Sequence, residues 1–468
     1  MNTKKIISFS LGPLGAAFFS FITMPITAWI FSIEDIGRLS IFQVIVTFST
    51  LLFSMGLDQA YVREYHESKD KPALLKVTLL PGFCLLFIAA SLLWILPFQW
   101  SEMVFSARDP SVSMLLVICL FCSFLSRFLS LTLRMEERAI AYSMSQLTPK
   151  VVMLIFVTMY YLSSIKLDFS ELASAFTASQ VTVLVVLLFN TKKQWLSAIQ
   201  SKLDKKYLIV ILKFGTPLVF GAVAYWGLTA LDRFVLRASS TFDELGLYSV
   251  SISFASAGVI IQSVFSTIWA PTVYKWAANG LENEKIEKVI DAVLFFVLIL
   301  FSISGLLSWL VIYVLPEKYN SVQYIVISCI ALPLLYALSE ATVVGIGLKK
   351  KTIFAMMSSF IALVVNIVAL YFFVPKYGAA GAAVSTAISF WVFLFLRTEF
   401  SARVWYSFPR VKIYFSTFVV VCLSCLNSLF GSEYKTVFIT SWMAFLVLFV
   451  VFNFKYVVNI YGVAVKNK

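Results

Sequence analysis

Long apolar runs, separated by short polar segments, repeat along the whole chain. A helix needs about 20 mostly apolar residues to cross roughly 30 Å of hydrocarbon, and about fourteen runs reach that length. The expected spans lie near residues 8–31, 37–60, 74–98, 111–133, 143–164, 170–190, 208–232, 246–274, 288–314, 321–347, 352–374, 378–397, 411–430 and 436–457. The pattern therefore predicts an all-α polytopic membrane protein with about 14 transmembrane helices.

The composition and the charge agree with a membrane protein. Only 13% of the residues are charged and the mean hydropathy is +0.90, far above the range of soluble globular chains. If Met1 is cytoplasmic, most of the 37 Lys and Arg fall on cytoplasmic segments, among them Lys4, Lys5, Lys69, Lys71, Lys192, Lys193, Lys205, Lys206 and Lys349 to Lys351. This positive-inside distribution predicts that both termini are cytoplasmic. The net charge of +13 is then explained by the attraction of these residues to the anionic lipids of the inner leaflet. Binding to nucleic acid is not needed to explain it.

The cysteines and the single histidine do not form a metal or cofactor pattern. All six Cys lie within expected spans, and the only His, His66, lies in a loop. Metal sites usually combine Cys with His or acidic side chains, so the Cys are expected to be small buried side chains. The sequence predicts no metal site and no cofactor.

Two halves of the chain resemble each other at an offset of 209 residues, which aligns Gly37 with Gly246. The stretch IEDIGRLSIF (33–42) then faces FDELGLYSVS (242–251), and upstream SLGPL (10–14) resembles FGTPL (214–218). We therefore expect two pseudo-symmetric six-helix bundles with a substrate site at their interface, as in transporters built from repeats. The expected parts are an N-terminal bundle (1–190), a cytoplasmic linker (191–207), a C-terminal bundle (208–400) and two additional transmembrane helices with a cytoplasmic tail (401–468).

Two expected spans carry a narrow polar stripe on one helix face. The stripes consist of Ser40, Gln43, Thr47, Thr50, Ser54 and Asp58 in the second span, and Ser249, Ser253, Ser256, Ser263 and Thr267 in the eighth. Tight helix packing is one interpretation, because small hydroxyl residues are common at such contacts. The other is a water-lined cavity wall, which the matching stripes and the terminal Asp58 favour. The candidate substrate-binding residues are then Gln43, Thr47, Ser54, Ser256 and Ser263, and Asp58 is a candidate for ion coupling or gating.

Ionisable side chains deep in spans are costly to insert and are therefore candidate functional residues. Arg127 lies well inside the fourth span, and Glu340 lies in the tenth at nearly the repeat-equivalent depth. Arg127 is a candidate substrate-binding residue. Glu340 could pair with an opposite charge such as Arg127 and lock the two halves, or it could couple transport to an ion gradient.

Charges near span ends allow two interpretations. Lys213, Lys150 and Arg63 can extend towards the lipid head groups, or they can face a substrate, for which Lys213 and Arg63 are kept as candidates. Asp232 and Arg233 close the seventh span at the expected outer face, where the pair would hydrate and anchor the helix end. A gating contact between the halves is the second interpretation of this region. Glu244, with its acidic neighbour at 243, would favour the positive end of the next helix dipole.

At these positions the sequence resembles a known family. The stretch FGTPLVFGAVAYWGLTALDRFVLRASSTFDELGLYSVSISFASAGVIIQSVFSTIWAPTVYKW (214–276) looks like the seventh and eighth spans of Wzx-type oligosaccharide flippases of the multidrug/oligosaccharidyl-lipid/polysaccharide exporter superfamily. The matching positions are Pro217, Trp226, Asp232, Arg233, Glu244, Leu245, Gly246, Tyr248, Ser249, Trp269 and Pro271. GLDQAYVREYHE (56–67) and NIVALYFFVPKYGAAGAAVSTAIS (366–389) also agree, so the resemblance covers nearly the whole chain.

The resemblance implies a V-shaped pair of bundles that alternates access in the bacterial inner membrane. Its cargo would be an oligosaccharide on undecaprenyl pyrophosphate, moved to the outer leaflet for O-antigen, capsule or exopolysaccharide assembly. Polymerase or export machinery would be a further partner. A groove of Ser, Thr and Gln suits sugars, and cations such as Arg127 and Lys213 suit pyrophosphate.

Two other functions remain as alternatives. A multidrug or small-solute exporter of the same superfamily usually needs acidic residues in its cavity, which Asp58 and Glu340 could supply, whereas Arg127 favours an anionic cargo. A polysaccharide-modifying enzyme usually carries a large outer catalytic loop, and no such loop is expected here. GIGLKKKT (345–352) lacks the second glycine of a P-loop, so ATP hydrolysis is not expected.

Overall fold

The computed structural model describes residues 3–95, 100–107, 109–163, 167–278 and 283–452, and every regular element in these ranges is a helix. The first half contains α1 (Thr3–Ile30), α2 (Ile33–Ser54), α3 (Leu57–Glu64), α4 (Lys71–Ile95), α5 (Trp100–Phe105), α6 (Pro110–Met135), α7 (Ala139–Leu162), α8 (Phe169–Asn190) and α9 (Lys192–Gln200). The second half contains α10 (Lys205–Ser239), α11 (Phe242–Ala255), α12 (Ala257–Ala278), α13 (Asn283–Leu307), η1 (Ser308–Tyr313), η2 (Glu317–Tyr319), α14 (Val322–Cys329), α15 (Ala331–Thr342), α16 (Val344–Leu348), α17 (Ile353–Val404), α18 (Val411–Phe430) and α19 (Lys435–Phe452). The all-α polytopic fold predicted from the sequence is confirmed.

The number of membrane crossings is close to the predicted one. Within the described residues, 11 helices are long and apolar enough to cross a membrane, and the bent pair α11 and α12 raises the number to 12. At 1.5 Å per residue, the 52 residues of α17 are too long for one crossing, and this helix turns at Gly378. The shorter α19 is also apolar. Fourteen crossings therefore stays a prediction.

Several expected spans are broken helices. The second span ends at Met55 and Gly56, which both adopt left-handed conformations, before α3 continues it. The eighth span bends by 46° between α11 and α12. In α17, Gly378 has a φ of 51°, and the next amide, the N–H of Ala379, donates to Oε2 of Glu244 at 2.7 Å. A non-glycine residue is disfavoured at that φ.

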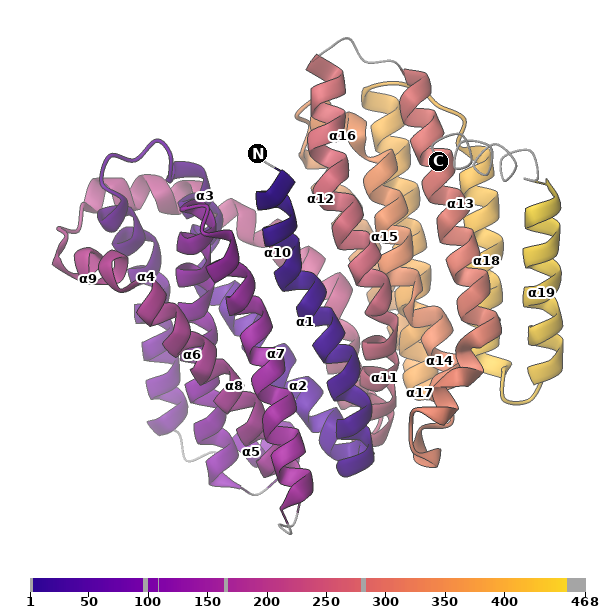
Figure 1. The fold of residues 1–468 in the computed structure, drawn as a ribbon, viewed down its shortest axis with the longest axis horizontal. Helices are drawn as coiled ribbons and strands as arrows, with labels where there is room; N and C mark the ends of the chain where they lie inside the picture. The colour runs from indigo at the N-terminus through magenta and orange to yellow at the C-terminus, as the bar shows by residue number, and fades with distance from the viewer. Residues whose placement is uncertain (1–2, 96–99, 108, 164–166, 279–282, 453–468) are drawn as a thin grey trace.

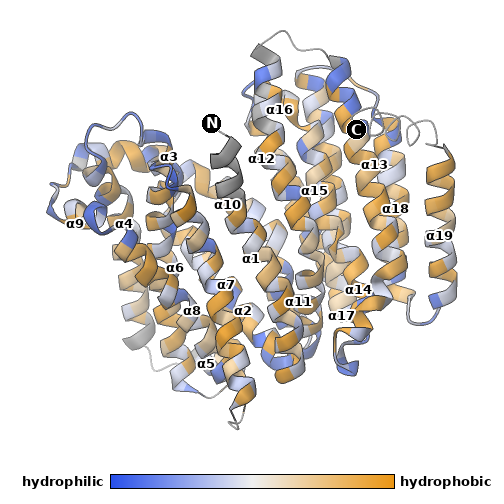
Figure 2. Cartoon of the chain, viewed as in Figure 1, coloured by the Kyte–Doolittle hydropathy of each residue, from blue (hydrophilic) through white to orange (hydrophobic). Residues whose placement is uncertain are grey.

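The helices form two lobes, which we call the N-lobe (α1–α9) and the C-lobe (α10–α19) (Figure 1). We call the face where α1 begins the proximal face and the opposite face, where α1 ends and α2 begins, the distal face. In Figure 1, α2 and α11 lie side by side towards the distal face, whereas α3 and α12 diverge towards the proximal face. Figure 2 shows hydrophobic residues along the middle of the helices and hydrophilic residues gathered at both ends, the distribution that a bilayer requires.

The segment that joins the lobes is more ordered than a polar linker suggests. It contains α9, which packs against α4, where Nζ of Lys76 donates to the carbonyls of Ile199 and Ser201 at 2.8 and 2.6 Å. Helix α10 contacts α2 and α3 of the N-lobe and also packs against α17 of the C-lobe. The seventh span thus lies along both lobes.

Candidate functional site

A cavity of about 320 Å³ lies between the lobes, and we call it the central cavity. Three N-lobe helices (α1, α2 and α7) and two C-lobe helices (α10 and α11) form its wall. Its lining residues are Ser20, Thr23, Met24, Thr27, Ile36, Leu39, Ser40, Gln43, Val44, Thr47, Lys150, Met153, Arg233, Ser249, Ile252 and Ser253. The wall thus mixes hydroxyl, amide, cationic and apolar side chains, and none of these residues is acidic.

A second cavity of about 290 Å³ shares Thr47 with the first, and we call it the side cavity. It is lined by Thr47, Thr50, Leu51, Ser54, Gly56, Asp58, Gln59, Ser123, Arg127, Leu218, Val219 and Ala222. The polar stripe of the second span therefore runs along both cavities, because Ser40, Gln43 and Thr47 line the first and the other three members line the second. A polar stripe of this kind gives a ligand hydrogen-bonding groups along α2 and the start of α3.

The stripe of the eighth span reaches the central cavity only at its start. Ser249 and Ser253 line it, whereas the helix then breaks at Ser256. Neither Ser256 nor Ser263 lines either cavity, and their hydroxyls donate to the carbonyls of Ser253 and Ile260 on their own helices. The helix breaks between the Ser residues that line the cavity and these two, which a continuous helical projection could not reveal.

Two cations in the central cavity make no side-chain ion pair among the described residues, although Arg233 interacts electrostatically with the buried carboxylate of its neighbour Asp232. Lys150 is exposed to the cavity and Arg233 is half-buried, and neither side chain makes an ion pair or a hydrogen bond there. Lys150 comes from α7 of the N-lobe and Arg233 from α10 of the C-lobe. Charged groups without a side-chain ion pair are available to bind an anion from both lobes at once.

Arg127 and Asp58 form an ion pair in the side cavity. Nη2 and Nε of Arg127 donate to Oδ2 of Asp58 at 2.7 and 3.1 Å. The Asp58 side chain is 9% exposed and that of Arg127 is 45% exposed. The nearly buried carboxylate is therefore already neutralised, while one face of the guanidinium stays open to the cavity.

The sequence-based pairing of Glu340 with Arg127 is wrong, because each charge is paired within its own lobe. Oε1 of Glu340 accepts from Nη2 of Arg397 in α17 at 2.9 Å. The Arg397 guanidinium also donates to Ser339 and lies 5.0 Å from the ring centre of Phe393. These contacts tie α15 to α17 inside the C-lobe.

Asp232 is not hydrated at the distal face as the sequence suggested. Its side chain is buried, and its Oδ2 accepts hydrogen bonds from the hydroxyls of Tyr248 in α11 and Thr386 in α17. Its Oδ1 accepts from the backbone N–H of Arg233 at 2.8 Å. The two neighbouring charges thus point to different surroundings, one into the C-lobe and one into the central cavity.

Lys213 and Arg63 lie outside the lining of both cavities. Lys213 is exposed on α10. The Arg63 guanidinium lies 4.2 Å from the ring centre of Phe214 and 3.7 Å from a carboxylate oxygen of Glu64. Arg63 therefore holds α3 against the start of α10.

The contribution of α1 to the central cavity was not predicted from the sequence. Ser20, Thr23 and Thr27 follow one another at helical spacing and all face the cavity. That spacing was visible in the sequence. No cluster of three or more His, Cys, Asp or Glu that could hold a metal ion occurs among the residues that the structure describes.

Comparison with solved structures identifies the fold. The chain is similar to the lipid II flippase MurJ in an inward closed conformation, with a TM-score of 0.70 at 16% identity over 96% of this chain and 100% of the other. It is also similar to an inward-facing multidrug resistance MATE family transporter of the MOP superfamily, with a TM-score of 0.58 at 14% identity over 83% of this chain and 94% of the other. The similarity to a mutant of the Vibrio cholerae MATE transporter VcmN has a TM-score of 0.56 at 13% identity, over 86% of this chain and 96% of the other. At such identities the likeness shows the fold alone.

Comparison by sequence identifies the family. No curated protein matches the chain significantly. The family model described as "Polysaccharide biosynthesis protein" matches residues 2–277, which is more than half of the chain and includes every residue that lines the two cavities. The chain therefore belongs to the polysaccharide biosynthesis protein family.

Proposed function

We propose that this protein is a flippase that moves an oligosaccharide linked to undecaprenyl pyrophosphate from the inner to the outer leaflet of the bacterial inner membrane. The two lobes would alternate access to the central cavity, and the product would enter O-antigen, capsule or exopolysaccharide assembly. Family membership and the fold shared with a lipid II flippase support this proposal.

The observation that carries the proposal is the chemistry of the central cavity. A sugar and a pyrophosphate cannot cross hydrocarbon unaided, because each unsatisfied polar group there costs several kcal/mol. Gln43, Thr47 and Ser249 offer hydrogen bonds to sugar hydroxyls, and Lys150 and Arg233 offer unpaired positive charge to the pyrophosphate. We therefore assign the anionic head group to Lys150 and Arg233 ahead of Arg127, Lys213 and Arg63, while the prenyl chain stays in the lipid.

The orientation follows from charge. Lys69 and Lys71 lie in and next to the loop between α3 and α4, and Lys349 to Lys351 lie between α16 and α17, all at the proximal face (Figure 1). By the positive-inside rule this face would be cytoplasmic, and the start of α1 and the end of α19 would then lie on the cytoplasmic side. The substrate would enter from the proximal face and leave through the distal face. A polymerase or export complex would receive it there.

A multidrug exporter is the second candidate, because the chain also shares its fold with MATE transporters. Exporters of cationic drugs need acidic groups in the binding cavity. None of the residues that line the central cavity is acidic, and the one carboxylate of the side cavity is paired with Arg127. An anionic cargo therefore fits better, and we assign no enzymatic reaction to the cavity.

The test is deletion of the gene followed by analysis of the lipid-linked sugars in each leaflet. We expect lipid-linked oligosaccharide to accumulate on the inner leaflet and surface glycan to disappear, with restoration by the wild-type chain. Unchanged surface glycan together with new drug sensitivity would refute the flippase and support the exporter.

A further inference from the structure

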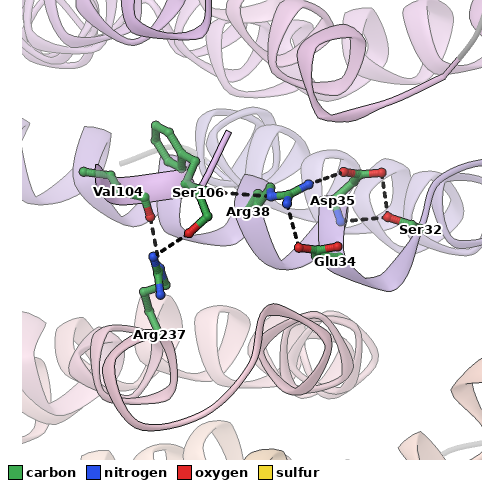
Figure 3. Close-up of polar contacts among 8 residues, drawn as sticks. Ser32, Glu34, Asp35, Arg38, Val104, Ser106 and Arg237 are labelled. Carbon is green, nitrogen blue, oxygen red and sulfur yellow. Dashed lines mark hydrogen bonds and ion pairs between the residues drawn. The ribbon is translucent and has the colours of Figure 1, made fainter. Parts of the chain in front are cut away.

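At the distal face, Arg237 of the C-lobe holds the short helix α5 of the N-lobe. Its Nε donates to the carbonyl of Val104 at 3.1 Å and its Nη2 to the hydroxyl of Ser106 at 2.9 Å. Figure 3 shows Arg237 reaching from α10 to the end of α5, where Ser106 has a φ of 51°. The contact joins two residues that are more than 130 positions apart in the chain.

A second cation of the C-lobe makes the same kind of contact with α1. Nζ of Lys318, in η2, donates to the carbonyl of Phe31 at 2.7 Å, directly after the last residue of α1. Beside it, Nε1 of Trp29 donates to the carbonyl of Val314 in the opposite direction, at 2.9 Å. Two N-lobe helices thus end against cationic side chains of the C-lobe.

The acceptors are the carboxyl ends of helices, which explains why cations bind there. The last carbonyls of a helix have no partner within the helix, and the helix dipole makes that end negative. Lys and Arg side chains are suited to such ends. The carbonyls of Val104 and Phe31 are backbone acceptors, and the hydroxyl of Ser106 adds one side-chain acceptor from the N-lobe.

Arg38 connects α5 to the rest of the N-lobe. Its Nε donates to the carbonyl of Phe105 at 3.0 Å, while its other nitrogens pair with Glu34 at 2.6 Å and Asp35 at 3.1 Å on its own helix (Figure 3). The guanidinium also lies 5.3 Å from the ring centre of Phe242 at the start of α11. Arg237 of α10 and Arg38 of α2 thus both bind the carboxyl end of α5, which links the contact of Arg237 to α2. The polar stripe of α2 lines the central cavity.

We propose that Arg237 and Lys318 form a reversible latch that keeps the distal face closed by capping the carboxyl ends of α5 and α1 across the two lobes. Both side chains must release their carbonyls before the lobes can part at this face. The released carbonyls lie at the end of the molecule, where water can replace the lost donors. Because water replaces Arg237 and Lys318 as the hydrogen-bond donor to these carbonyls, the free-energy cost of opening stays moderate.

This inference rests on the alternating motion of the proposed function, but it concerns the lobes and not the cargo. The latch is therefore tested by measuring distances between the lobes in the protein without any added ligand. Spin labels at Leu162 and Ser432 report on the distal face, and labels at Lys69 and Lys351 report on the proximal face. All four positions are exposed, and Cys84, the exposed native cysteine, is replaced by Ser.

In the wild type we expect one short distance for the distal pair. Arg237→Ala and Lys318→Ala should each raise the ratio of long to short distal distances by roughly tenfold, since a hydrogen bond to a charged group is lost, with the proximal pair shifting to shorter distances. In the conservative variants Arg237→Lys and Lys318→Arg, the new side chain can still reach the carbonyls. The distal label distances in these variants should therefore stay mostly short. Lys376→Ala is the matched control, because Lys376 lies near the turn of α17 and its Nζ lies 5.0 Å from the ring centre of Tyr377 in its own lobe.

Three outcomes would overturn the latch. Distal distances in both alanine variants that equal those of Lys376→Ala would show that the contacts do not hold the face closed. Equal shifts in the conservative variants would show that packing and not capping matters. Broadening of both label pairs would show unfolding in place of opening. A chain that opens as expected but moves no lipid-linked sugar would refute the proposed function and leave the latch intact.

Discussion

Gly37 and Gly246, which the internal repeat aligns with each other, pack against each other where α2 crosses α11. A Cβ on Gly37 would lie 3.1 Å from the backbone nitrogen of Gly246 and 2.2 Å from the carbonyl oxygen of Phe242. A Cβ on Gly246 would lie 2.1 Å from the carbonyl oxygen of Ile33. The repeated acidic-aliphatic-glycine motif is thus a site of close backbone approach between the lobes, and its two copies are each other's partner.

Substitution of either glycine should weaken the packing of α2 against α11. A methyl group at Gly37 or Gly246 meets backbone atoms, which cannot move aside as the end of a side chain can. We expect Gly37→Ala and Gly246→Ala each to lower the free energy of unfolding by about 1–3 kcal/mol, measured by thermal unfolding in detergent. Gly221→Ala is the matched control, since its Cβ would meet only a Met356 side-chain atom at an ordinary 3.8 Å. Equal melting temperatures in all three variants would contradict the close approach.

The cations of the central cavity should be needed for export and not for folding. Lys150→Ala and Arg233→Ala each remove an unpaired charge from the proposed head-group site, so we expect export to fall by roughly tenfold or more at normal protein levels. Lys150→Arg keeps the charge and should retain most of the activity. The measurement is surface glycan together with the amount of protein in the membrane.

Lys213→Ala is the control for this prediction, because Lys213 lies on the same helix as Arg233 but outside both cavities. It should export normally. Loss of export in Lys213→Ala with full activity in Lys150→Ala would move the head-group site away from the central cavity.

The ion pair of Arg127 and Asp58 should behave asymmetrically. Arg127→Ala leaves a nearly buried carboxylate without a partner, whereas Asp58→Asn leaves a guanidinium that is 45% exposed. We expect Arg127→Ala to be the more destabilising change, with the double variant Arg127→Ala, Asp58→Asn recovering part of the loss. A double-mutant cycle of thermal unfolding measures the coupling, for which we expect about 1–3 kcal/mol because Arg127 is partly solvated. Strict additivity of the two changes would contradict the pairing.

Most of the fold could be predicted from the sequence, because an apolar run of about 20 residues directly indicates a membrane-spanning helix and its approximate ends. The prediction for the span at 411–430 coincides with α18, and the expected span at 170–190 differs from α8 by one residue. The breaks were harder to predict. Ser256 is an ordinary hydroxyl residue at the end of α11. Helix α11 packs mainly on α2 and α14, whereas α12 packs mainly on α15, and a single-helix pattern does not contain these contacts between elements.

The candidate site was predictable only in part. The stripe from Ser40 to Asp58 has helical spacing, and the structure places all of it along the two cavities. The partners of the charges were not predictable. Glu340 meets Arg397, 57 residues away, because α15 packs on α17. Periodicity identifies the face of a helix, but the identity of the neighbour depends on tertiary packing.

The carboxylate of Glu244 should stabilise the turn in α17. It accepts the N–H of Ala379 at the start of the second half of that helix, a backbone group that has no partner within the helix. We expect Glu244→Ala to lower the free energy of unfolding by about 1 kcal/mol, as for the loss of an N-terminal cap. Asp243→Ala is the matched control, because Asp243 is exposed in the same turn of α11. Equal thermal unfolding midpoints of the two variants would contradict this role.

Asp232 is the candidate for ion coupling whose surroundings fit that role best. Its carboxylate is buried between α10, α11 and α17 and accepts from Tyr248 and Thr386, so a change in its charge would alter the contacts of three C-lobe helices at once. Asp232→Asn keeps the shape and removes the charge. We expect this variant to reach the membrane in normal amounts but to lose the dependence of flipping on an ion gradient, measured with lipid-linked oligosaccharide in proteoliposomes at varied pH and sodium concentration. Thr386→Val is the matched control, because its hydroxyl lies 3.4 Å from the carboxylate and its loss leaves both the charge and the Tyr248 contact in place. If Asp232→Asn responds to the gradient as the wild type does, the coupling group lies elsewhere and Asp232 serves only to join the three helices.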